Sequence, residues 1–283
     1  MNLRELWVDT KKELDSSNIS DSDIESEVII RKVLGLDRNN FFATLDNPVS
    51  IRKTSQIKKN LQQRISGIPL SYITKNREFF GIDFFVNEHV LIPRQESELL
   101  VEKVISFCKK QKQTKLTIAD IGTGSGALAI SIAKNLKNTN VIATDISNKA
   151  LQIAKKNAKN IEVSRNISFL HSNLLENLKT PVNMIVANLP YLTSKEMNTL
   201  SLEVKKEPTI ALFGGEDGTD LIVKLIRQAP KHLKKNGNLI LEISPSQKNI
   251  ILSLMKESFP KSKPKIHKDY AKIERAISIE IYI

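Results

Sequence analysis

Residues 117–134 read TIADIGTGSGALAISIAK, and they carry the strongest indication of the fold class. An apolar segment ending at Ile121 has the character of a buried strand, and the small apolar residues after Gly126 have that of a helix. Between them, alternating glycines let the backbone turn sharply and bring its N–H groups close to a ligand at the helix N-terminus. A purely structural turn would not need three of them. We therefore expect cofactor contacts from Gly122, Gly124 and Gly126.

Asp145 is the expected partner of this turn. It ends the next apolar segment, NVIATDI (140–146), and follows Gly122 by 23 residues. A carboxylate about 20 residues after such a turn typically accepts hydrogen bonds from a ribose diol. The same carboxylate could instead cap the helix that begins near Ser147. We favour the ribose contact, because open α/β sheets bind ligands in the crevice outside the carboxyl ends of their strands.

Asp120, just before the glycine turn, helps to choose the cofactor. The pattern is G-x-G-x-G after an acidic residue, whereas dinucleotide-binding folds carry G-x-G-x-x-G. A carboxylate here suits the ammonium and sulfonium of S-adenosylmethionine better than a pyrophosphate, although Asp120 could also bind backbone amides of the turn. With this D-x-G-x-G-x-G pattern the chain resembles the class I methyltransferases. That resemblance implies an S-adenosylmethionine site and a seven-stranded sheet whose last strand is reversed.

Short apolar segments alternate with helical stretches from about residue 116 onward. Such alternation predicts a mostly parallel sheet covered by helices, and the regular pattern of the last segment predicts an antiparallel edge strand. The predicted fold class is therefore α/β, with a Rossmann-like class I methyltransferase sheet. The expected strands are LTIADI (116–121), NVIATDI (140–146), ISFL (167–170), NMIVAN (183–188), NLILEI (238–243) and RAISIEIYI (275–283).

Residues 1–74 are predicted to form a small helical domain, which we interpret as a substrate-recognition module; a bundle that serves only stability is the alternative. Ser22 with Glu25 predicts a capping box, and Gly35 a C-terminal cap. Residues 75–283 form the second domain, which begins with a β-hairpin linker around Gly81. The apolar residues expected to mark the helices are Ile24, Val28 and Leu34, and later Ile51, Ile57, Leu61 and Ile65.

The segment Asn188-Leu189-Pro190-Tyr191 follows the fourth expected strand and suits a site that grips an amino group. An amide nitrogen is a poor nucleophile because its lone pair is delocalised. The Asn188 side-chain oxygen and the Leu189 carbonyl could each accept one N–H and so direct the lone pair at a methyl donor. Pro190 stiffens the turn, and Tyr191 offers a face to a planar group. Asn and Pro also form ordinary turns, but behind a cofactor turn we expect Asn188 and Tyr191 to be catalytic.

Two substrate classes share this motif: Asn-Leu-Pro-Tyr is typical of ribosomal-RNA adenine N6-methyltransferases, and Asn-Pro-Pro-Tyr of glutamine methyltransferases. The segments RISGIPLSYITKNREFFGIDFFVNEHVLIPRQESELLVE (64–102) and EVKKEPTIALFGGEDGTD (203–220) resemble those of the PrmC (HemK) family. This resemblance spans nearly all of residues 60–283. It implies an enzyme that methylates N5 of the glutamine in the Gly-Gly-Gln motif of peptide chain release factors. A ribosomal-protein glutamine methyltransferase and an rRNA adenine N6-methyltransferase remain the alternatives.

Carried over by position, the resemblance implies the site residues. Three positions depart from the family pattern: Asn173 stands where the family often has Asp, Gln95 and Ser97 replace Pro and Thr, and Leu189 replaces the first proline of Asn-Pro-Pro-Tyr. Cofactor contacts are expected from Gly122, Thr123, Gly124, Ser125, Gly126, Asp145, Asn173, Leu174 and Asn188, and substrate contacts from Asn188, Leu189, Pro190 and Tyr191.

Composition limits the remaining classes. The net charge of +12 is spread over short lysine pairs, so it is compatible with work near the ribosome but does not establish nucleic acid as a substrate. One cysteine, Cys108, and four scattered histidines show no metal-ligand spacing, so no metal is expected. The N-terminus lacks a signal-peptide pattern, and no apolar run approaches the roughly 20 residues of a membrane span. We expect a cytoplasmic monomer whose partners are release factors.

Overall fold

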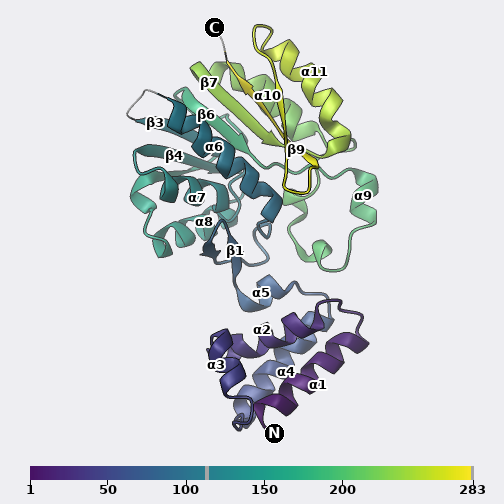
Figure 1. Cartoon of the computed structure of the whole chain (residues 1–283). Coiled ribbons are helices and arrows are strands. Elements are labelled where there is room, and N and C mark those ends of the chain that lie inside the picture. Colours follow the sequence, from purple (N-terminus) through teal and green to yellow (C-terminus); the bar gives the residue numbers. More distant parts are fainter. Residues whose placement is uncertain (112–114, 282–283) are drawn as a thin grey trace. The chain divides into compact units, whose positions relative to one another are not determined.

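The computed structural model describes residues 1–111 and 115–281, and the chain forms two compact units. One unit comprises Met1–Asn76 together with Ser201–Lys206, and the other comprises Arg77–Leu200 and Glu207–Ile283. Figure 1 shows their elements in chain order. A short segment from late in the sequence thus packs with the N-terminal helices, and each unit has its own apolar core.

The first unit is helical, and each of its longer helices presents an apolar face to a common core. Leu14, Ile29 and Phe41 are fully buried there, and burial of one such side chain contributes about 1.5–3 kcal/mol. The Trp7 ring packs edge-on against Phe41, and its N–H donates to Ser26 Oγ (3.0 Å). The helices are α1 (Leu3–Ser16), α2 (Ser22–Leu34), α3 (Arg38–Ala43), α4 (Ile51–Ile65) and α5 (Leu70–Thr74).

The capping prediction for α2 is half right. Gly35 ends the helix in the left-handed conformation (φ 74°), which confirms the predicted C-terminal cap. Ser22 and Glu25 form no capping box, because Ser22 is already the first helical residue and the N-cap is Asp21. The Ser22 hydroxyl donates to Asp15 at the end of α1 instead, so it ties two helices together.

The predicted core positions of these helices are partly wrong. Ile57 and Leu61 of α4 are buried as expected, but Ile24 and Ile51 are 61% and 90% exposed. The buried face of α2 carries Ile29 instead, because the neighbouring helices, and not the apolar spacing alone, decide which face turns inward. The other predicted positions, Val28, Leu34 and Ile65, are half-buried.

A short antiparallel hairpin opens the second unit, as predicted. Strand β1 (Arg77–Phe79) pairs with β2 (Ile82–Phe84), and Phe79 faces Ile82 across the pair. Phe80 and Gly81 form the turn with φ of 53° and 69°. The buried rings of Phe79 and Phe84 contact each other edge-on across the hairpin.

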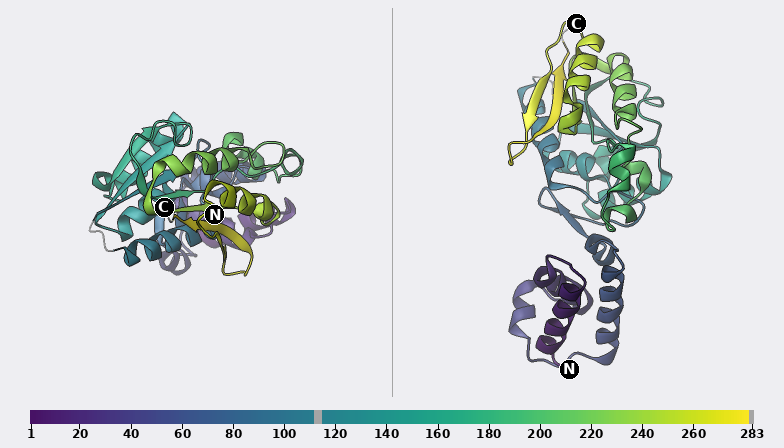
Figure 2. Two further views of the ribbon diagram at one scale, coloured as in Figure 1. Left: turned by 90° about the horizontal axis from the view of Figure 1, so that it is seen from above. Right: turned by 90° about the vertical axis from the view of Figure 1, so that its right-hand side faces the viewer.

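The second unit is built on a seven-stranded sheet of order β5-β4-β3-β6-β7-β9-β8. The strands from β3 to β7 run parallel, and β9 runs antiparallel to both β7 and β8 (Figures 1 and 2). The predicted α/β sheet with a reversed strand is confirmed. The strands are β3 (Leu116–Ile121), β4 (Thr139–Asp145), β5 (Ile167–His171), β6 (Val182–Ala187), β7 (Leu233–Glu242), β8 (Lys265–Lys268) and β9 (Glu274–Glu280).

The reversed strand does not lie at the edge of the sheet, contrary to the prediction. Strand β8 pairs with its outer side, so β9 is an inner strand and its central residues Ala276 and Ile277 are fully buried. The sequence of β8, KIHK, is short and mostly polar, as suits an edge strand, and gives little apolar signal. Residues 282–283 of the predicted last strand lie outside the described residues.

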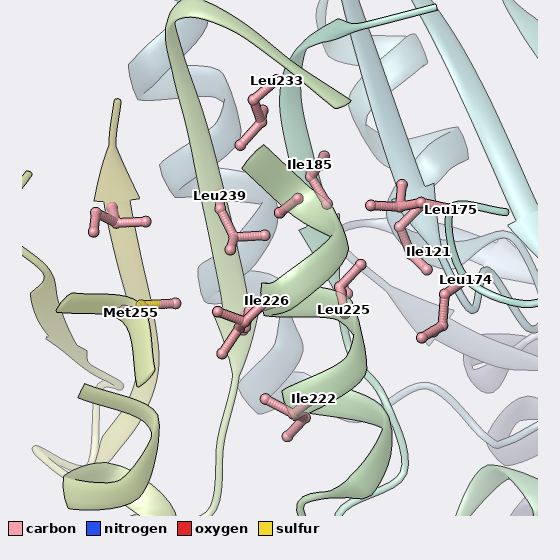
Figure 3. Packing of buried hydrophobic residues seen from close by; sticks show 14 of the residues in the cluster. Ile121, Leu174, Leu175, Ile185, Ile222, Leu225, Ile226, Leu233, Leu239 and Met255 are labelled. Carbon is pink, nitrogen blue, oxygen red and sulfur yellow. The ribbon is translucent and has the colours of Figure 1, made fainter. Parts of the chain in front are cut away.

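Helices cover both faces of the sheet (Figures 1 and 2). Figure 3 shows Leu225 and Ile226 of α10 packed toward Ile185 of β6 and Leu239 of β7, all fully buried. None of the helices in the described part of the chain is long and apolar enough to cross a membrane. The α-helices after the hairpin are α6 (Glu98–Lys110), α7 (Ala127–Asn135), α8 (Asn148–Asn160), α9 (Ser194–Asn198), α10 (Asp220–His232) and α11 (Lys248–Ser258). The 3-10 turns are η1 (Gln95–Ser97), η2 (Ser164–Asn166), η3 (Val204–Lys206), η4 (Thr209–Ala211) and η5 (Pro245–Gln247).

Candidate active site

A cavity of about 250 Å³ opens at the carboxyl ends of β3, β4 and β6, where the strand order of the sheet reverses. Its walls also include His89, Leu91 and Ile210. Among the described lining residues there is no lysine or arginine, and Asp145 is the one carboxylate. The predicted site residues that line this cavity together are Gly122, Gly124, Asp145, Asn173, Leu174, Asn188, Leu189 and Pro190.

The glycine turn between β3 and α7 forms one wall. Gly122 and Gly124 have φ of 73° and 55°, a region that glycine adopts without steric cost. The N–H groups of Gly122 and Thr123 both donate to the Thr144 carbonyl (2.9 and 2.8 Å), and Gly124 N–H donates to Asp145 Oδ2 (2.9 Å). A Cβ on Gly124 would meet nothing within 4 Å, so this residue leaves space open beside the carboxylate.

Three predicted cofactor residues support the turn and do not line the cavity. Thr123 donates its hydroxyl to Asp120 Oδ2 (2.6 Å). The buried Ser125 accepts a hydrogen bond on its carbonyl from Asn157 Nδ2 (2.9 Å). Gly126 is the N-cap of α7, with φ of 85°, and packs so closely against neighbouring side chains that a Cβ would clash. These three residues stabilise the glycine turn that forms this wall of the cavity.

Asp120 lies under the turn and is fully buried. Its Oδ2 accepts from Thr123 and from Ala129 N–H (3.1 Å), and Oδ1 has no partner within the described ranges. Burial raises the pKa of Asp120 to about 7, against the lowering effect of these two hydrogen bonds. The geometry therefore favours the second interpretation of Asp120, a residue that binds the turn, over direct contact with a cationic ligand.

Asp145 reaches the cavity while it organises the backbone around it. Its Oδ1 accepts from Ser147 N–H (2.8 Å) and its Oδ2 from Gly124 N–H. The N-cap of α8 is Ser147, whose hydroxyl accepts from Ala150 N–H (3.2 Å), so Asp145 is not the cap itself. Burial raises the pKa of Asp145, and the backbone hydrogen bonds oppose that shift. Each carboxylate oxygen retains a lone pair that could accept from a hydroxyl.

Asn173 and Leu174 line the cavity on the side of β5. Asn173 Nδ2 donates to Glu176 Oε1 (2.9 Å), and Glu176 is paired in turn with Lys224 (2.8 Å). With its nitrogen so engaged, the Asn173 amide keeps its oxygen for a ligand. Leu174 is buried with φ of 52°.

The segment after β6 offers two acceptors at the cavity. Asn188 Nδ2 donates to Ser97 Oγ (2.8 Å), and Asn188 Oδ1 accepts no hydrogen bond from any described residue. The Leu189 carbonyl is likewise without a donor in the described part of the chain. The Leu189 side chain is buried in the core next to Gly122, so this residue anchors the segment.

Tyr191 lies beside the cavity but is not among its lining residues. Its carbonyl accepts from Gln247 Nε2 (2.9 Å), and its backbone passes Gly218 so closely that a Cβ there would lie 2.2 Å from the Tyr191 oxygen. Burial raises the pKa of Tyr191 to about 12, so the phenol stays neutral. Only glycine at 218 lets the two segments approach this far.

Several residues that hold the site were missed from the sequence. Glu207, 5% exposed, accepts from Ile92 N–H (2.9 Å) and pairs with Arg94, so it fixes the loop that carries His89 and Leu91. Glu242 accepts the hydroxyl of Ser97. The Glu-Pro of the 203–220 segment was a usable signal for Glu207, whereas Glu242 lies at the end of an ordinary apolar strand. No cluster of His, Cys, Asp or Glu among the described residues could hold a metal.

Solved structures share the fold of the second unit. A methyltransferase of Pyrococcus furiosus matches with a TM-score of 0.53 at 20% identity, over 72% of this chain and 91% of that one. A 16S rRNA methyltransferase of T. thermophilus, solved with AdoMet and guanosine, matches with a TM-score of 0.54 at 17% identity, over 73% of this chain and 49% of that one. These similarities show a methyltransferase fold.

Sequence relatives are more specific. A release factor glutamine methyltransferase of Dictyoglomus turgidum is 36% identical over 280 residues, 98% of each chain. That of Bradyrhizobium diazoefficiens is 34% identical over 268 residues, 94% of this chain and 90% of the relative. A bifunctional methyltransferase of Rickettsia conorii is 33% identical over 276 residues, and there the match spans 53% of the relative's length.

Two family models match separate parts of the chain. The PrmC N-terminal domain matches residues 5–74, and the methyltransferase small domain matches residues 95–205. The first range falls in the helical unit, and the second contains the glycine turn, Asp145 and the segment after β6. Together with relatives that match over nearly their whole length, these matches show that the chain belongs to the release factor glutamine methyltransferase family.

Proposed function

We propose that this enzyme transfers a methyl group from S-adenosylmethionine to N5 of the glutamine in the Gly-Gly-Gln motif of peptide chain release factors. The observation that carries the proposal is the pair of unengaged acceptors, Asn188 Oδ1 and the Leu189 carbonyl, at the cavity beside the glycine turn. A primary amide has two N–H groups, and two acceptors on adjacent residues can take one each.

The cavity suits S-adenosylmethionine in its donor set and charge. Asp145 can accept from a ribose diol, Asn173 from an adenine amine, and Gly124 leaves room for the ligand. The described lining residues include a carboxylate but no lysine or arginine, which favours a cationic ligand over a pyrophosphate. When bound, the cofactor would supply an electrophilic methyl group on its sulfonium.

The protein's own contribution is to position the amide nitrogen. Because the lone pair of an amide is delocalised, the nitrogen reacts only when that lone pair points at the methyl carbon. Fixing both N–H groups on Asn188 and Leu189 sets this direction, and such positioning can supply roughly 7–11 kcal/mol of a barrier. The nitrogen becomes acidic as it gains the methyl group, so no strong base is required.

The helical unit is proposed as the recognition domain for the release factor. Its match to the PrmC N-terminal domain supports this role, as does the presence of large exposed apolar side chains such as Ile24 and Ile51. We further propose that the protein acts as a cytoplasmic monomer and that nucleic acid is not its substrate. The names of the full-length relatives support a release factor as the substrate.

A transfer assay tests the substrate. Labelled S-adenosylmethionine is incubated with the enzyme and, separately, with a release factor, a ribosomal protein or rRNA. We expect label on the release factor and none on the same factor with Ala in place of the Gly-Gly-Gln glutamine. Label on RNA alone, or undiminished label on the Ala variant, would overturn the proposal.

The Asn188→Ala variant tests the gripping role. It removes one of the two substrate acceptors but leaves the glycine turn and Asp145 in place. We expect kcat to fall by on the order of a hundredfold or more, because the amide loses its alignment, while the Kd of the cofactor by calorimetry changes little. An equal loss of turnover and cofactor affinity would show that Asn188 serves the cofactor rather than the substrate.

A further inference from the structure

The amide of the half-buried Asn188 is held by a hydrogen-bond network with two buried side chains, Ser97 and Glu242. Asn188 Nδ2 donates to Ser97 Oγ (2.8 Å), and Ser97 Oγ donates to Glu242 Oε2 (2.5 Å). Ser97 ends η1, Glu242 ends β7, and Asn188 follows β6, the parallel neighbour of β7. Ser97 and Glu242 are only 4% and 2% exposed. The Asn188–Ser97–Glu242 network therefore lies at the carboxyl edge of the sheet, where the cavity opens.

Stability alone does not explain Ser97 and Glu242. Ser97 occupies the N-cap position of α6, but its side chain makes no capping bond there. Glu242 is a buried carboxylate whose one hydrogen-bond donor among the described residues is Ser97, and it forms no ion pair with them. An apolar side chain at 242 would avoid the desolvation cost of a buried charge. The two residues are instead arranged around Asn188.

The number of protons in the network sets its direction. An ionised carboxylate only accepts, and a hydroxyl has a single proton to donate. Ser97 gives that proton to Glu242 and is left with lone pairs for Asn188. Asn188 must then present its NH₂ to Ser97, and its oxygen turns toward the cavity. The charge of Glu242 thereby decides which end of the Asn188 amide a ligand meets.

We propose that Ser97 and Glu242 are positioning residues for methyl transfer, which hold Asn188 with Oδ1 toward the substrate amide. This inference rests on the proposed function, because it concerns how the glutamine is gripped. A flipped Asn188 would present N–H groups to the N–H groups of the substrate. The substrate nitrogen would then keep only the Leu189 carbonyl as its acceptor.

The charges that act on Glu242 come from several elements. Arg275 on β9 and Arg94 before η1 favour its ionised form, Glu96 on η1 opposes it, and the nearby Tyr191 is neutral. Burial outweighs them and raises the pKa of Glu242 to about 7.

Protonation should reverse the network. A protonated Glu242 can donate to Ser97, and Ser97 can then donate to Asn188 Oδ1, which turns the Asn188 NH₂ toward the cavity. Because the network is productive only with ionised Glu242, kcat should fall as the pH decreases through the pKa of Glu242, near 7. This acidic limb is a signature that a merely structural role would not produce.

Serine variants test the network directly. Ser97→Ala removes the anchor of Asn188, and we expect kcat to fall on the order of tenfold, the effect of one hydrogen bond, with cofactor Kd unchanged. Ser97→Thr keeps the hydroxyl and should retain most of the turnover. Ser131→Ala is the matched control: Ser131 is a fully buried serine of α7 whose hydroxyl has no partner in the described structure, so its loss should leave kcat unchanged.

The pH profile tests Glu242. In Glu242→Gln the side chain no longer titrates, so the acidic limb of kcat near pH 7 should disappear. Asp120→Asn, which removes another buried carboxyl with a pKa of about 7, should keep the limb. A limb that persists unchanged in Glu242→Gln would overturn the proposal, as would turnover of Ser97→Ala equal to that of Ser131→Ala.

A readout without substrate separates this inference from the proposed function. In ¹⁵N-labelled protein the side-chain NH₂ of Asn188, identified by its loss in Asn188→Ala, should exchange slowly and should exchange faster in Ser97→Ala. If the wild-type enzyme methylates no release factor yet this protection is observed, the proposed substrate is wrong and the orientation stands. If the wild type methylates the factor and Ser97→Ala changes neither protection nor kcat, the positioning role alone is wrong.

Discussion

Leu189 stands where the family pattern has a proline, and its surroundings explain why the exchange is compatible with the site. The position needs a free carbonyl, and leucine retains it. Pro190 still biases Leu189 toward an extended backbone. Leucine in place of proline at 189 therefore loses only the conformational restriction of one proline ring, about 0.4–1 kcal/mol of stability. In return the leucine side chain is buried beside Gly122, where a Cβ would lie 3.0 Å from its Cδ2. The segment after β6 is thereby packed directly against the glycine turn.

Asn173 is a second departure, and its neighbour Glu176 explains it. Asn173 donates to Glu176, so Asp at 173 would set two carboxylates against each other. We expect Asn173→Asp to weaken cofactor binding on the order of tenfold, or about 1.4 kcal/mol, by calorimetry. The double variant Asn173→Asp/Glu176→Gln lets residue 176 donate to the new carboxylate and should restore affinity. Equal Kd values for the single and double variants would show that Glu176 does not orient residue 173.

In the glycine turn, the stability cost of a strained backbone can be measured separately from the space that a ligand needs. Ala at Gly124 must adopt φ of 55°, which costs roughly 1–2 kcal/mol for a residue with a Cβ. The new methyl meets no protein atom within 4 Å, and Gly124 lines the cavity, so the methyl takes up space beside the ligand. We therefore expect Gly124→Ala to fold with slightly lower stability but to lose cofactor affinity on the order of tenfold or more.

Gly81→Ala is the matched control for that strain. Gly81 lies in the same unit, has φ of 69°, and also has nothing within 4 Å of a built Cβ, but it belongs to the hairpin turn and not to the cavity. Both variants should lower the urea midpoint by a similar amount, and only Gly124→Ala should lower cofactor affinity. A parallel loss of affinity in Gly81→Ala would assign the effect to general destabilisation.

Elements with a continuous apolar pattern were predictable, and those shaped by packing were not. Strand β6 is buried at all six positions and is apolar at every one except Asn183, so its place in a parallel sheet follows from the sequence. Strand β8 has four residues, two of them lysines, so its sequence gives little strand signal. It forms a strand because it pairs with the outer side of β9. Likewise, the inward face of α2 depends on the helices around it, which left Ile24 exposed against expectation.

The whole molecule adds contacts that no local pattern contains. The sequence predicted eight residues that line the cavity, because a glycine turn and a strand-end Asn carry local signals. Ser97 and Glu242 are separated by 145 positions, and neither has a local signal for its partner. Only the folded sheet edge brings them together at Asn188. The contacts of Ser97 and Glu242 with Asn188 therefore could not be predicted from sequence patterns.

Buried carboxyl groups make the stability of the second unit pH-dependent. Burial raises the pKa of both Asp120 and Glu242 to about 7, above the roughly 4 of an unfolded chain. The folded unit therefore binds more protons, and the stability gained at low pH is lost as the pH rises toward 7. Asp120→Asn should flatten this dependence between about pH 4 and pH 7 by up to about 1.4 kcal/mol per pH unit, measured by urea unfolding with circular dichroism.

The single tryptophan supplies an internal control. Trp7 lies in the first unit, so its fluorescence follows that unit, whereas both carboxyl groups lie in the second. The lowered pKa of His267 acts in the opposite sense, but it is common to the wild type and the variant and cancels in the comparison. A pH dependence of unfolding that is the same with and without Asp120 would contradict the prediction.

Recognition by the helical unit can be separated from catalysis by comparing two substrates. Ile51 is 90% exposed at the first position of α4, where an acidic residue is favourable for the helix, so Ile51→Asp should fold normally. If this unit binds the release factor through its apolar surface, the variant should raise KM for the intact factor several-fold. A short Gly-Gly-Gln peptide reaches only the cavity, so its kcat and KM should not change.

The control is Ile250→Asp, at a 54% exposed position of α11 in the other unit, and we expect it to change the KM of neither substrate. A rise in KM for both substrates in Ile51→Asp would place the effect in the cavity, and no rise for the factor would exclude this face of α4 from recognition.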